Sequence, residues 1–145
     1  MFGKIRQKKA EKLKAQIAIA DARLALTKAE IAAQLIKLAG QTSDVALLKE
    51  ANESLTIARE FFGFENAPIE ICLVQAALGD MFFTLGRKAS DRSVMTQAKA
   101  AYRTAITMAS LQGDEALRAD LRAKVKLVDS LLGQGPKTPS LFRAA

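Results

Sequence analysis

The stretch PIEICLVQAALGDMFFTLG, residues 68–86, decides the fold. It carries only two charged residues, and its apolar residues would fall on every side of a helix. A helix that is apolar all round must be covered on several faces. A membrane span would need about 20 predominantly apolar residues, and polar residues interrupt this stretch at Glu70, Gln75, Asp80 and Thr84. We therefore interpret it as the central buried helix of a helical array.

The composition of the whole chain predicts an all-α protein. Half of the 145 residues are hydrophobic, which suffices for one domain with a core. Good helix formers dominate and only three prolines occur. No Asn-Gly or Asp-Gly hairpin signal is present, and Val and Thr are too scattered to form strands.

Charge divides the chain into three segments. Residues 1–15 form a basic N-terminal extension with one acidic residue, Glu11, against six basic ones: Lys4, Arg6, Lys8, Lys9, Lys12 and Lys14. Residues 16–132 are neutral and form the predicted helical domain. Residues 133–145 contain two Gly, two Pro and two basic residues, and we expect a flexible tail. The basic excess of the chain, +7 overall, therefore belongs to its ends.

Several classes of chemistry are excluded or disfavoured by composition. The chain has no histidine and a single cysteine, Cys72, which rules out histidine bases, Cys–His zinc sites and an internal disulfide. No Gly-rich phosphate-binding loop occurs. The chain begins without an apolar signal segment. We predict a cytoplasmic protein that is not an enzyme and uses no cofactor or metal.

Five helices are expected, and Gly, Ser, Asp or Pro marks each boundary. Gly40 is expected to end the first helix and Gly86 the third, while Ser43 or Asp44 and Ser90 or Asp91 cap the helices that follow. The expected helices are 4–39, 44–61, 68–86, 91–110 and 114–132. The first is long and basic at its start, and its apolar set is Ile17, Ile19, Ala20, Leu24, Ile31, Leu35 and Leu38. The last has one apolar stripe and one charged side, as expected of a terminal cap.

The chain repeats with an offset of 47 residues. Ser43-Asp44 aligns with Ser90-Asp91, and small residues align with small residues across the two units. The aligned core positions of the first unit are Ala29, Ala32, Ala39, Ala51, Leu55 and Ala58, and those of the second are Ala76, Gly79, Gly86, Ala98, Tyr102 and Ala105. The pattern predicts two consecutive helical hairpins.

The second unit resembles the tetratricopeptide repeat signature in Leu78-Gly79, Phe82, Gly86, Ala98, Tyr102 and Ala105. The linker 62–68 is similar to the longer linkers of kinesin-light-chain-type repeats. The resemblance covers residues 28–110 and implies a short α-solenoid of antiparallel helical hairpins; repeats of the HEAT type, about 40–47 residues long, are the alternative.

The resemblance also implies a non-enzymatic interaction module that binds a peptide or helix of another protein. Its groove positions would be Leu26, Ala29, Ala33, Ile36 and Lys37 in the first unit and Leu73, Ala76, Asp80, Phe83 and Thr84 in the second. These are mostly apolar, which predicts an apolar ligand face. Alternatively, the same residues pack against the chain's own N-terminal helix. The basic arm, residues 1–15, offers a different function, a tether to anionic membrane or nucleic acid. With only two hairpins, leftover apolar surface also predicts a possible homodimer, and no small-molecule substrate is expected.

Overall fold

The computed structural model describes residues 2–133. This range contains five helices and no strand, which confirms the all-α prediction. The predicted tail lies outside the described residues, apart from Gly133. The helices are α1 (Phe2–Thr42), α2 (Val45–Phe62), α3 (Ile69–Lys88), α4 (Arg92–Gln112) and α5 (Glu115–Gly133).

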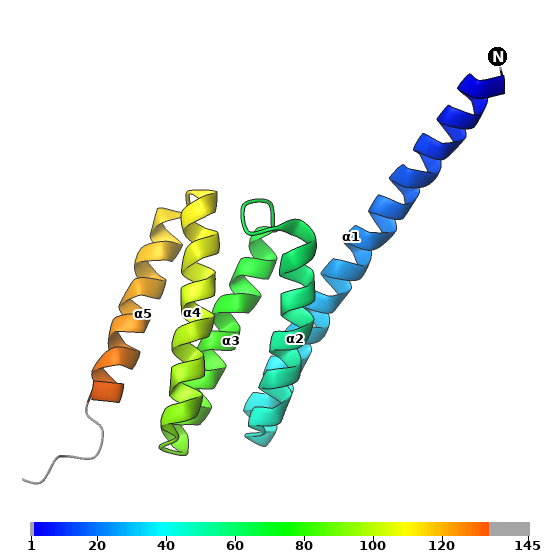
Figure 1. Cartoon of the computed structure of the whole chain (residues 1–145). Coiled ribbons are helices and arrows are strands. Elements are labelled where there is room, and N and C mark those ends of the chain that lie inside the picture. Colours follow the sequence, from blue (N-terminus) through cyan, green and yellow to red (C-terminus); the bar gives the residue numbers. More distant parts are fainter. Residues whose placement is uncertain (1, 134–145) are drawn as a thin grey trace, which may run out of the picture.

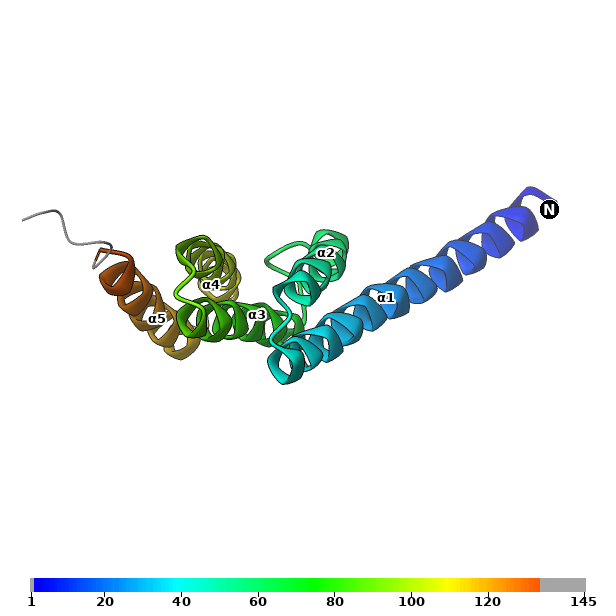
Figure 2. The same cartoon turned by 90° about the horizontal axis from the view of Figure 1, so that it is seen from below.

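The helices stand side by side in chain order, and the chain turns back at each connection (Figure 1). Seen from below, α1, α3 and α5 form one row and α2 and α4 form a second row (Figure 2). The N-terminal part of α1 projects well beyond the other helices (Figure 1).

The corners between α1 and α2 and between α3 and α4 have the same local geometry. Ser43 and Ser90 adopt left-handed φ values of 55° and 52°. Asp44 and Asp91 then cap the next helix, with φ/ψ of −98°/104° and −97°/104°, and each carboxylate accepts a hydrogen bond from a backbone N–H of the first turn. The aligned caps therefore form equivalent corners 47 residues apart.

Gly40 and Gly86 do not end their helices, contrary to the sequence prediction. Helix α1 continues to Thr42 and α3 to Lys88. The residue with positive φ is a serine in each corner, and the glycines serve close packing instead. A Cβ on Gly40 would lie 2.6 Å from Met81 Cε, and one on Gly86 would lie 2.9 Å from the backbone nitrogen of Met95.

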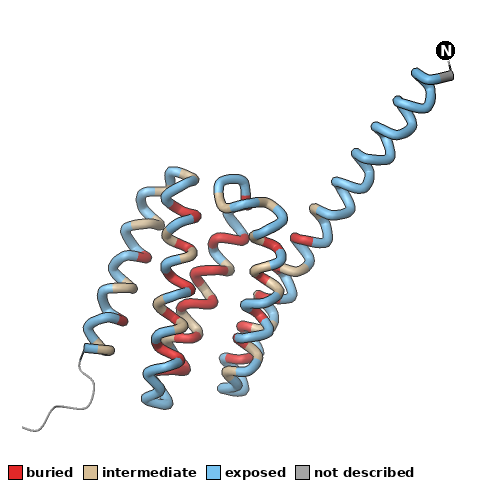
Figure 3. The backbone as a smooth tube through the Cα atoms, viewed as in Figure 1, coloured by how far each residue is buried: buried red, intermediate tan, exposed pale blue. Residues whose placement is uncertain are grey.

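The core is continuous through all five helices. Its largest fully buried side chains include Tyr102, Leu48, Leu55, Ile71 and Leu78. Helix α5 adds Leu121 and Val128, two members of the stripe expected on a capping helix. The buried residues line the facing sides of the helices, and the projecting part of α1 is exposed throughout (Figure 3).

The face of α1 that packs against the core is not the face that carries its predicted apolar set. Its buried residues are small except for one: Ala25, Ala29, Ala32, Ile36 and Ala39. Of the predicted apolar set only Leu35 packs against the core, and the other members are exposed. Alanines let the backbones of α1, α2 and α3 approach closely, so this packing selects the alanine face over the face with longer side chains.

Helix α3 is the most apolar helix in the described range. Its length and its mean hydropathy of 1.5 over 18 residues would suit a membrane-crossing helix, and half of that window is buried inside the array. Its buried residues pack among α1, α2 and α4. This burial explains the apolar composition of residues 68–86.

The linker between α2 and α3 is held by the end of α4. Gln112 donates hydrogen bonds from Nε2 to the carbonyls of Phe64, at 2.9 Å, and Ala67, at 3.0 Å. Ala67 is itself buried. These contacts fix the point at which α3 begins, beside the middle of α1.

Candidate binding groove

A hollow of about 420 Å³ lies between α1 and the first two turns of α3. Both walls are apolar apart from two glutamates, Glu30 on α1 and Glu70 on α3. The hollow is lined by Leu26, Ala29, Glu30, Ala33, Pro68, Glu70, Ile71 and Val74. An occupant would therefore meet apolar side chains and two negative charges.

The structure brings three of the predicted first-unit groove residues to this hollow: Leu26, Ala29 and Ala33. Leu26 is exposed, Ala33 is half-buried and Ala29 is almost fully covered. Ile36 is buried in the core and Lys37 is exposed. Neither of these two lines the hollow.

None of the predicted second-unit residues lines the hollow between α1 and α3. Leu73 and Thr84 are exposed on α3, and Ala76 is buried. Phe83 is half-buried, with the Arg87 guanidinium 5.8 Å from the centre of its ring. The two predicted sets therefore do not form one continuous site, since this part of the chain lines the hollow with Pro68, Glu70, Ile71 and Val74 instead.

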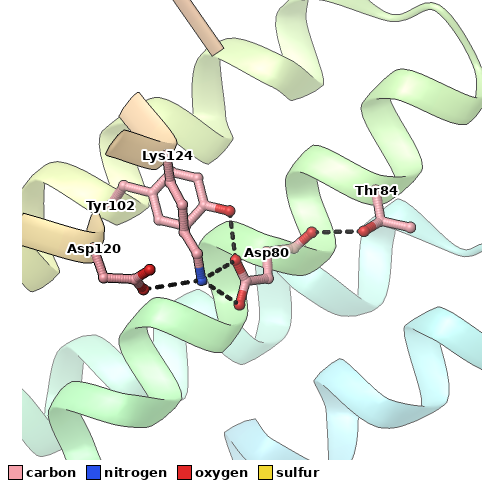
Figure 4. Close-up of polar contacts among 5 residues, drawn as sticks. All are labelled: Asp80, Thr84, Tyr102, Asp120 and Lys124. Carbon is pink, nitrogen blue, oxygen red and sulfur yellow. Dashed lines mark hydrogen bonds and ion pairs between the residues drawn. The ribbon is translucent and has the colours of Figure 1, made fainter. Parts of the chain in front are cut away.

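Asp80 is engaged within the protein rather than free in a groove (Figure 4). Tyr102 Oη donates a hydrogen bond to Asp80 Oδ1 over 2.6 Å. Lys124 Nζ lies 3.1 Å from Asp80 Oδ1 and 3.5 Å from Asp120 Oδ2. Thr84 donates to the backbone carbonyl of Asp80. This cluster joins α3, α4 and α5, so the role of Asp80 in this structure is to dock the last helix.

The cluster shifts the pKa of two of its members in the same direction. Burial, followed by the hydrogen bond to Asp80, raises the pKa of Tyr102 far above its ordinary value. Burial acts to lower the pKa of Lys124, but the hydrogen bonds and charges of Asp80 and Asp120 together outweigh it, and the net pKa is raised. Both residues therefore keep their protons in the folded state at neutral pH.

A second polar network, which the sequence did not suggest, lies between α2 and α4. Gln75, almost fully buried on α3, accepts a hydrogen bond from Arg59 Nη1 at 2.5 Å and donates one to the carbonyl of Ala101 at 3.2 Å. Arg59 also donates to Thr56 Oγ1 at 3.2 Å. A polar hollow of about 220 Å³ adjoins them. The sequence held one signal of this network, a glutamine inside the most apolar helix, because a buried side-chain amide requires hydrogen-bond partners.

Cys72 is not placed for catalysis. Its side chain is fully buried, and its thiol donates a long hydrogen bond of 3.7 Å to the carbonyl of Ala105. Burial, followed by the charge of Asp114, raises the pKa of this thiol, which keeps it protonated. Within residues 2–133 no group of three acidic or cysteine side chains is placed to hold a metal ion.

The basic arm lies on the projecting part of α1. Lys4, Arg6, Lys8, Lys9, Lys12 and Lys14 are all exposed there, and every residue from 3 to 21 is exposed. The arm is therefore a charged helix presented to solvent, separate from the hollow between α1 and α3 (Figures 1 and 3).

Comparison with known proteins gives no relative: the sequence matches no protein-family model and no curated protein, and the fold matches no solved structure. The resemblance to tetratricopeptide repeats therefore stays a prediction from Leu78-Gly79, Phe82, Gly86, Ala98, Tyr102 and Ala105.

Proposed function

We propose that this chain is a non-enzymatic interaction module, built as a short tetratricopeptide-like α-solenoid, that binds a partner peptide or helix in the hollow between α1 and α3. The observation that carries the proposal is the position of this hollow. It opens between the first helices of two consecutive hairpins, where the resemblance to tetratricopeptide repeats puts a ligand groove. The equivalent corners at Ser43-Asp44 and Ser90-Asp91 support the repeat interpretation.

The lining of the hollow supports a particular kind of partner. Leu26, Ala33 and Val74 offer apolar contact, which suits the apolar face of an amphipathic helix. Glu30 and Glu70 border the same hollow. Opposite charges across an interface steer partners and set their specificity, so the partner segment is expected to carry Lys or Arg beside its apolar residues.

Selection from a random peptide library displayed on phage tests this function with the full chain. We expect enriched peptides that combine apolar residues with Lys or Arg. Their binding should fall at least about tenfold in Leu26→Glu, which puts a charge into the apolar wall. The control is Ile57→Glu on α2, an equally drastic change at an exposed apolar residue of the other row. Failure to enrich any peptide, or equal binding by both variants, would contradict the groove.

The exposed basic arm supports the second function, attachment to an anionic membrane or nucleic acid. Six cations within residues 4–14 project away from the array, free to meet phosphates. Such binding should weaken steeply with salt and disappear when residues 1–15 are removed. Groove binding should survive both changes, so co-sedimentation with anionic vesicles and a duplex-binding assay separate the two functions.

A further inference from the structure

Helix α1 carries an apolar stripe on its outer side with a period of seven residues. Ile17, Leu24, Ile31 and Leu38 are 52%, 56%, 42% and 44% exposed. A spacing of seven keeps residues nearly on one line along a helix and is the seam of a coiled coil. Leu13, Ala20, Thr27 and Gln34 occupy the companion positions, each four residues before a stripe residue, and they are exposed as well.

The same positions in the second hairpin are buried. With the offset of 47 residues, Leu24, Ile31 and Leu38 correspond to Ile71, Leu78 and Leu85, which are 0%, 0% and 4% exposed. The difference arises because α3 has the preceding helices α1 and α2 packed against it, while within residues 2–133 no helix covers the outer side of α1. The stripe on α1 is therefore the face that a further helix would cover.

The stripe also points away from the proposed groove. Gly40 faces Met81 of α3. Leu38 precedes Gly40 by two residues, which turns it by about 200° around the helix axis. The stripe is thus on the side of α1 opposite α3, and none of its four residues lines the groove.

We infer that this stripe pairs with the same stripe of a second copy of the chain, antiparallel, with Leu24 level with Thr27 of the second copy. Pairing of one patch with itself about a two-fold axis is the commonest arrangement of homodimers. In this register Ile31 meets Ala20 of the second copy, and Leu38 meets Leu13 of the second copy. The paired region runs over residues 9–42, about 50 Å of helix.

Charge complementarity selects this register and direction. Side chains that flank the stripe decide orientation in coiled coils. In the antiparallel pair Arg23 meets Glu30 of the second copy, Asp21 meets Lys28 of the second copy, and each contact occurs twice. In a parallel pair Arg23 would meet Lys28 of the second copy, and Lys9 would meet Lys14 of the second copy. The antiparallel pair thus gains attraction where the parallel pair has repulsion.

A hollow on the outer face of α1 fits the same register. It measures about 440 Å³, and Glu30 and Ala33, which also line the groove, form one side of it. The rest of its lining includes Ile31, Gln34, Leu35 and Leu38. In the antiparallel register these four residues surround Ile17 of the second copy, in the manner of a knob entering a hole. The dimer would also cover much of the projecting part of α1, which has no neighbour within one copy.

Sedimentation equilibrium of the full chain, from low to high micromolar concentration, tests the inference. We expect a monomer–dimer equilibrium for the native chain. Arg23→Glu should raise the dimer Kd by about tenfold, since two attractions become repulsions. The double variant Arg23→Glu with Glu30→Arg should restore the native Kd. In a parallel dimer Arg23→Glu would instead tighten the pair, because Glu would meet Lys28.

An independent pair repeats the test away from the groove, since Glu30 borders both hollows. Asp21→Lys should weaken the dimer and Asp21→Lys with Lys28→Asp should restore it. Ile31→Glu should abolish the dimer, with Ile57→Glu on α2 as the control that leaves it intact. All six substituted positions, Arg23 and Glu30 included, are exposed or half-buried, so helix content by circular dichroism should not change.

Three results would overturn the inference: a monomer at every concentration, a dimer tightened by Arg23→Glu, or a dimer unaffected by Ile31→Glu. A monomer that binds anionic vesicles through the stripe would assign this face to a lipid surface instead. Peptide binding in the groove is measured separately with Leu26→Glu, so loss of the dimer and loss of the groove are distinguishable.

Discussion

The outer helices of the array, α1 and α5, present opposite surfaces to solvent. The outer side of α5 is mostly polar and charged, with Asp120, Arg122 and Lys126 exposed and Leu127 as its one large exposed apolar residue. The outer side of α1 carries Leu24, Ile31 and the rest of its apolar stripe. A terminal helix that closes a repeat array needs a polar outer face for solubility. The outer side of α5 is therefore mostly wet and polar, while the outer side of α1 leaves apolar side chains uncovered in the described structure.

The two helices are also held differently. Helix α5 inserts Leu121 and Val128 into the core and adds ion pairs, Lys124 to Asp80 and Lys99 to Asp129. Helix α1 contacts the core mainly through alanines. It packs closely, yet each residue buries little apolar area, and its longer side chains point outward. The following predictions test this contrast.

The largest expected difference in the free energy of unfolding comes from a Leu→Ala substitution made once in α5 and once in α1. Leu121→Ala should lower the free energy of unfolding by about 2–5 kcal/mol, because it opens a cavity in the core. Leu24→Ala should cost less than about 0.5 kcal/mol in dilute protein, because Leu24 is exposed. Urea denaturation followed by circular dichroism measures both. Equal losses in dilute solution would show that α1 is not exposed on its outer side.

A smaller change in the free energy of unfolding is expected when alanine replaces Gly79 of α3 or Gly40 of α1. A Cβ on Gly79 would lie 2.6 Å from the Tyr102 ring, a rigid neighbour, so Gly79→Ala should destabilise by about 1–3 kcal/mol. At Gly40 the neighbour is the flexible end of Met81, which can move aside. Gly40→Ala should therefore be neutral or gain up to about 1 kcal/mol from helix propensity. Thermal denaturation compares the two, and destabilisation of similar size at both sites would contradict this packing.

The smallest effect concerns the attachment of α5 at high pH. The pKa of Tyr102 and that of Lys124 are raised in the folded state. A raised pKa gives stabilisation that is complete below the unfolded-state value, about 10 for both groups, and is lost as pH rises through the folded value. The free energy of unfolding should thus be steady to about pH 9 and fall above about pH 10.

Tyr102→Phe is the matched control for this pH dependence. It should cost about 1–2 kcal/mol at neutral pH, through loss of the hydrogen bond to Asp80, and should flatten the fall above about pH 10. Urea denaturation at a series of pH values measures the free energy of unfolding of the native chain and of Tyr102→Phe. An unchanged alkaline slope in Tyr102→Phe would mean that other groups cause the loss.

Local signals in the sequence predicted the helices and their starts well. Capping is a property of a few adjacent residues, so Asp44 and Asp91 were foreseeable, and the all-α class followed from composition. The prediction that Gly40 and Gly86 end their helices is wrong, because a glycine can serve either a positive φ or close packing. Only the neighbouring helix, which the local sequence does not reveal, decides between the two uses.

The face that α1 turns inward was not predictable from hydrophobicity alone. Hydrophobicity alone would bury the stripe with the longer apolar side chains. The structure buries the alanine side instead, because small side chains let α1 lie close to α2 and α3. The hollow between α1 and α3 includes Leu26, Ala29 and Ala33 of the predicted ligand contacts, but its α3 side is formed by other residues than the predicted ones. Whether any of these residues contacts a partner stays a prediction. The sequence predicts Asp80 as a ligand contact and gives no sign of its partners, Tyr102 and Lys124, because they lie 22 and 44 residues further along the chain.

The length of α1 governs how the molecule diffuses. A 41-residue helix extends about 60 Å, roughly twice the length of any of the other four. Such a shape has a high frictional ratio, so a monomer would leave a gel-filtration column ahead of a globular standard of the same mass. A single copy would then be expected to elute at a volume close to that of a globular dimer. An antiparallel pair adds width along α1, so its elution would depart less from that of a globular standard than the elution of two copies joined end to end.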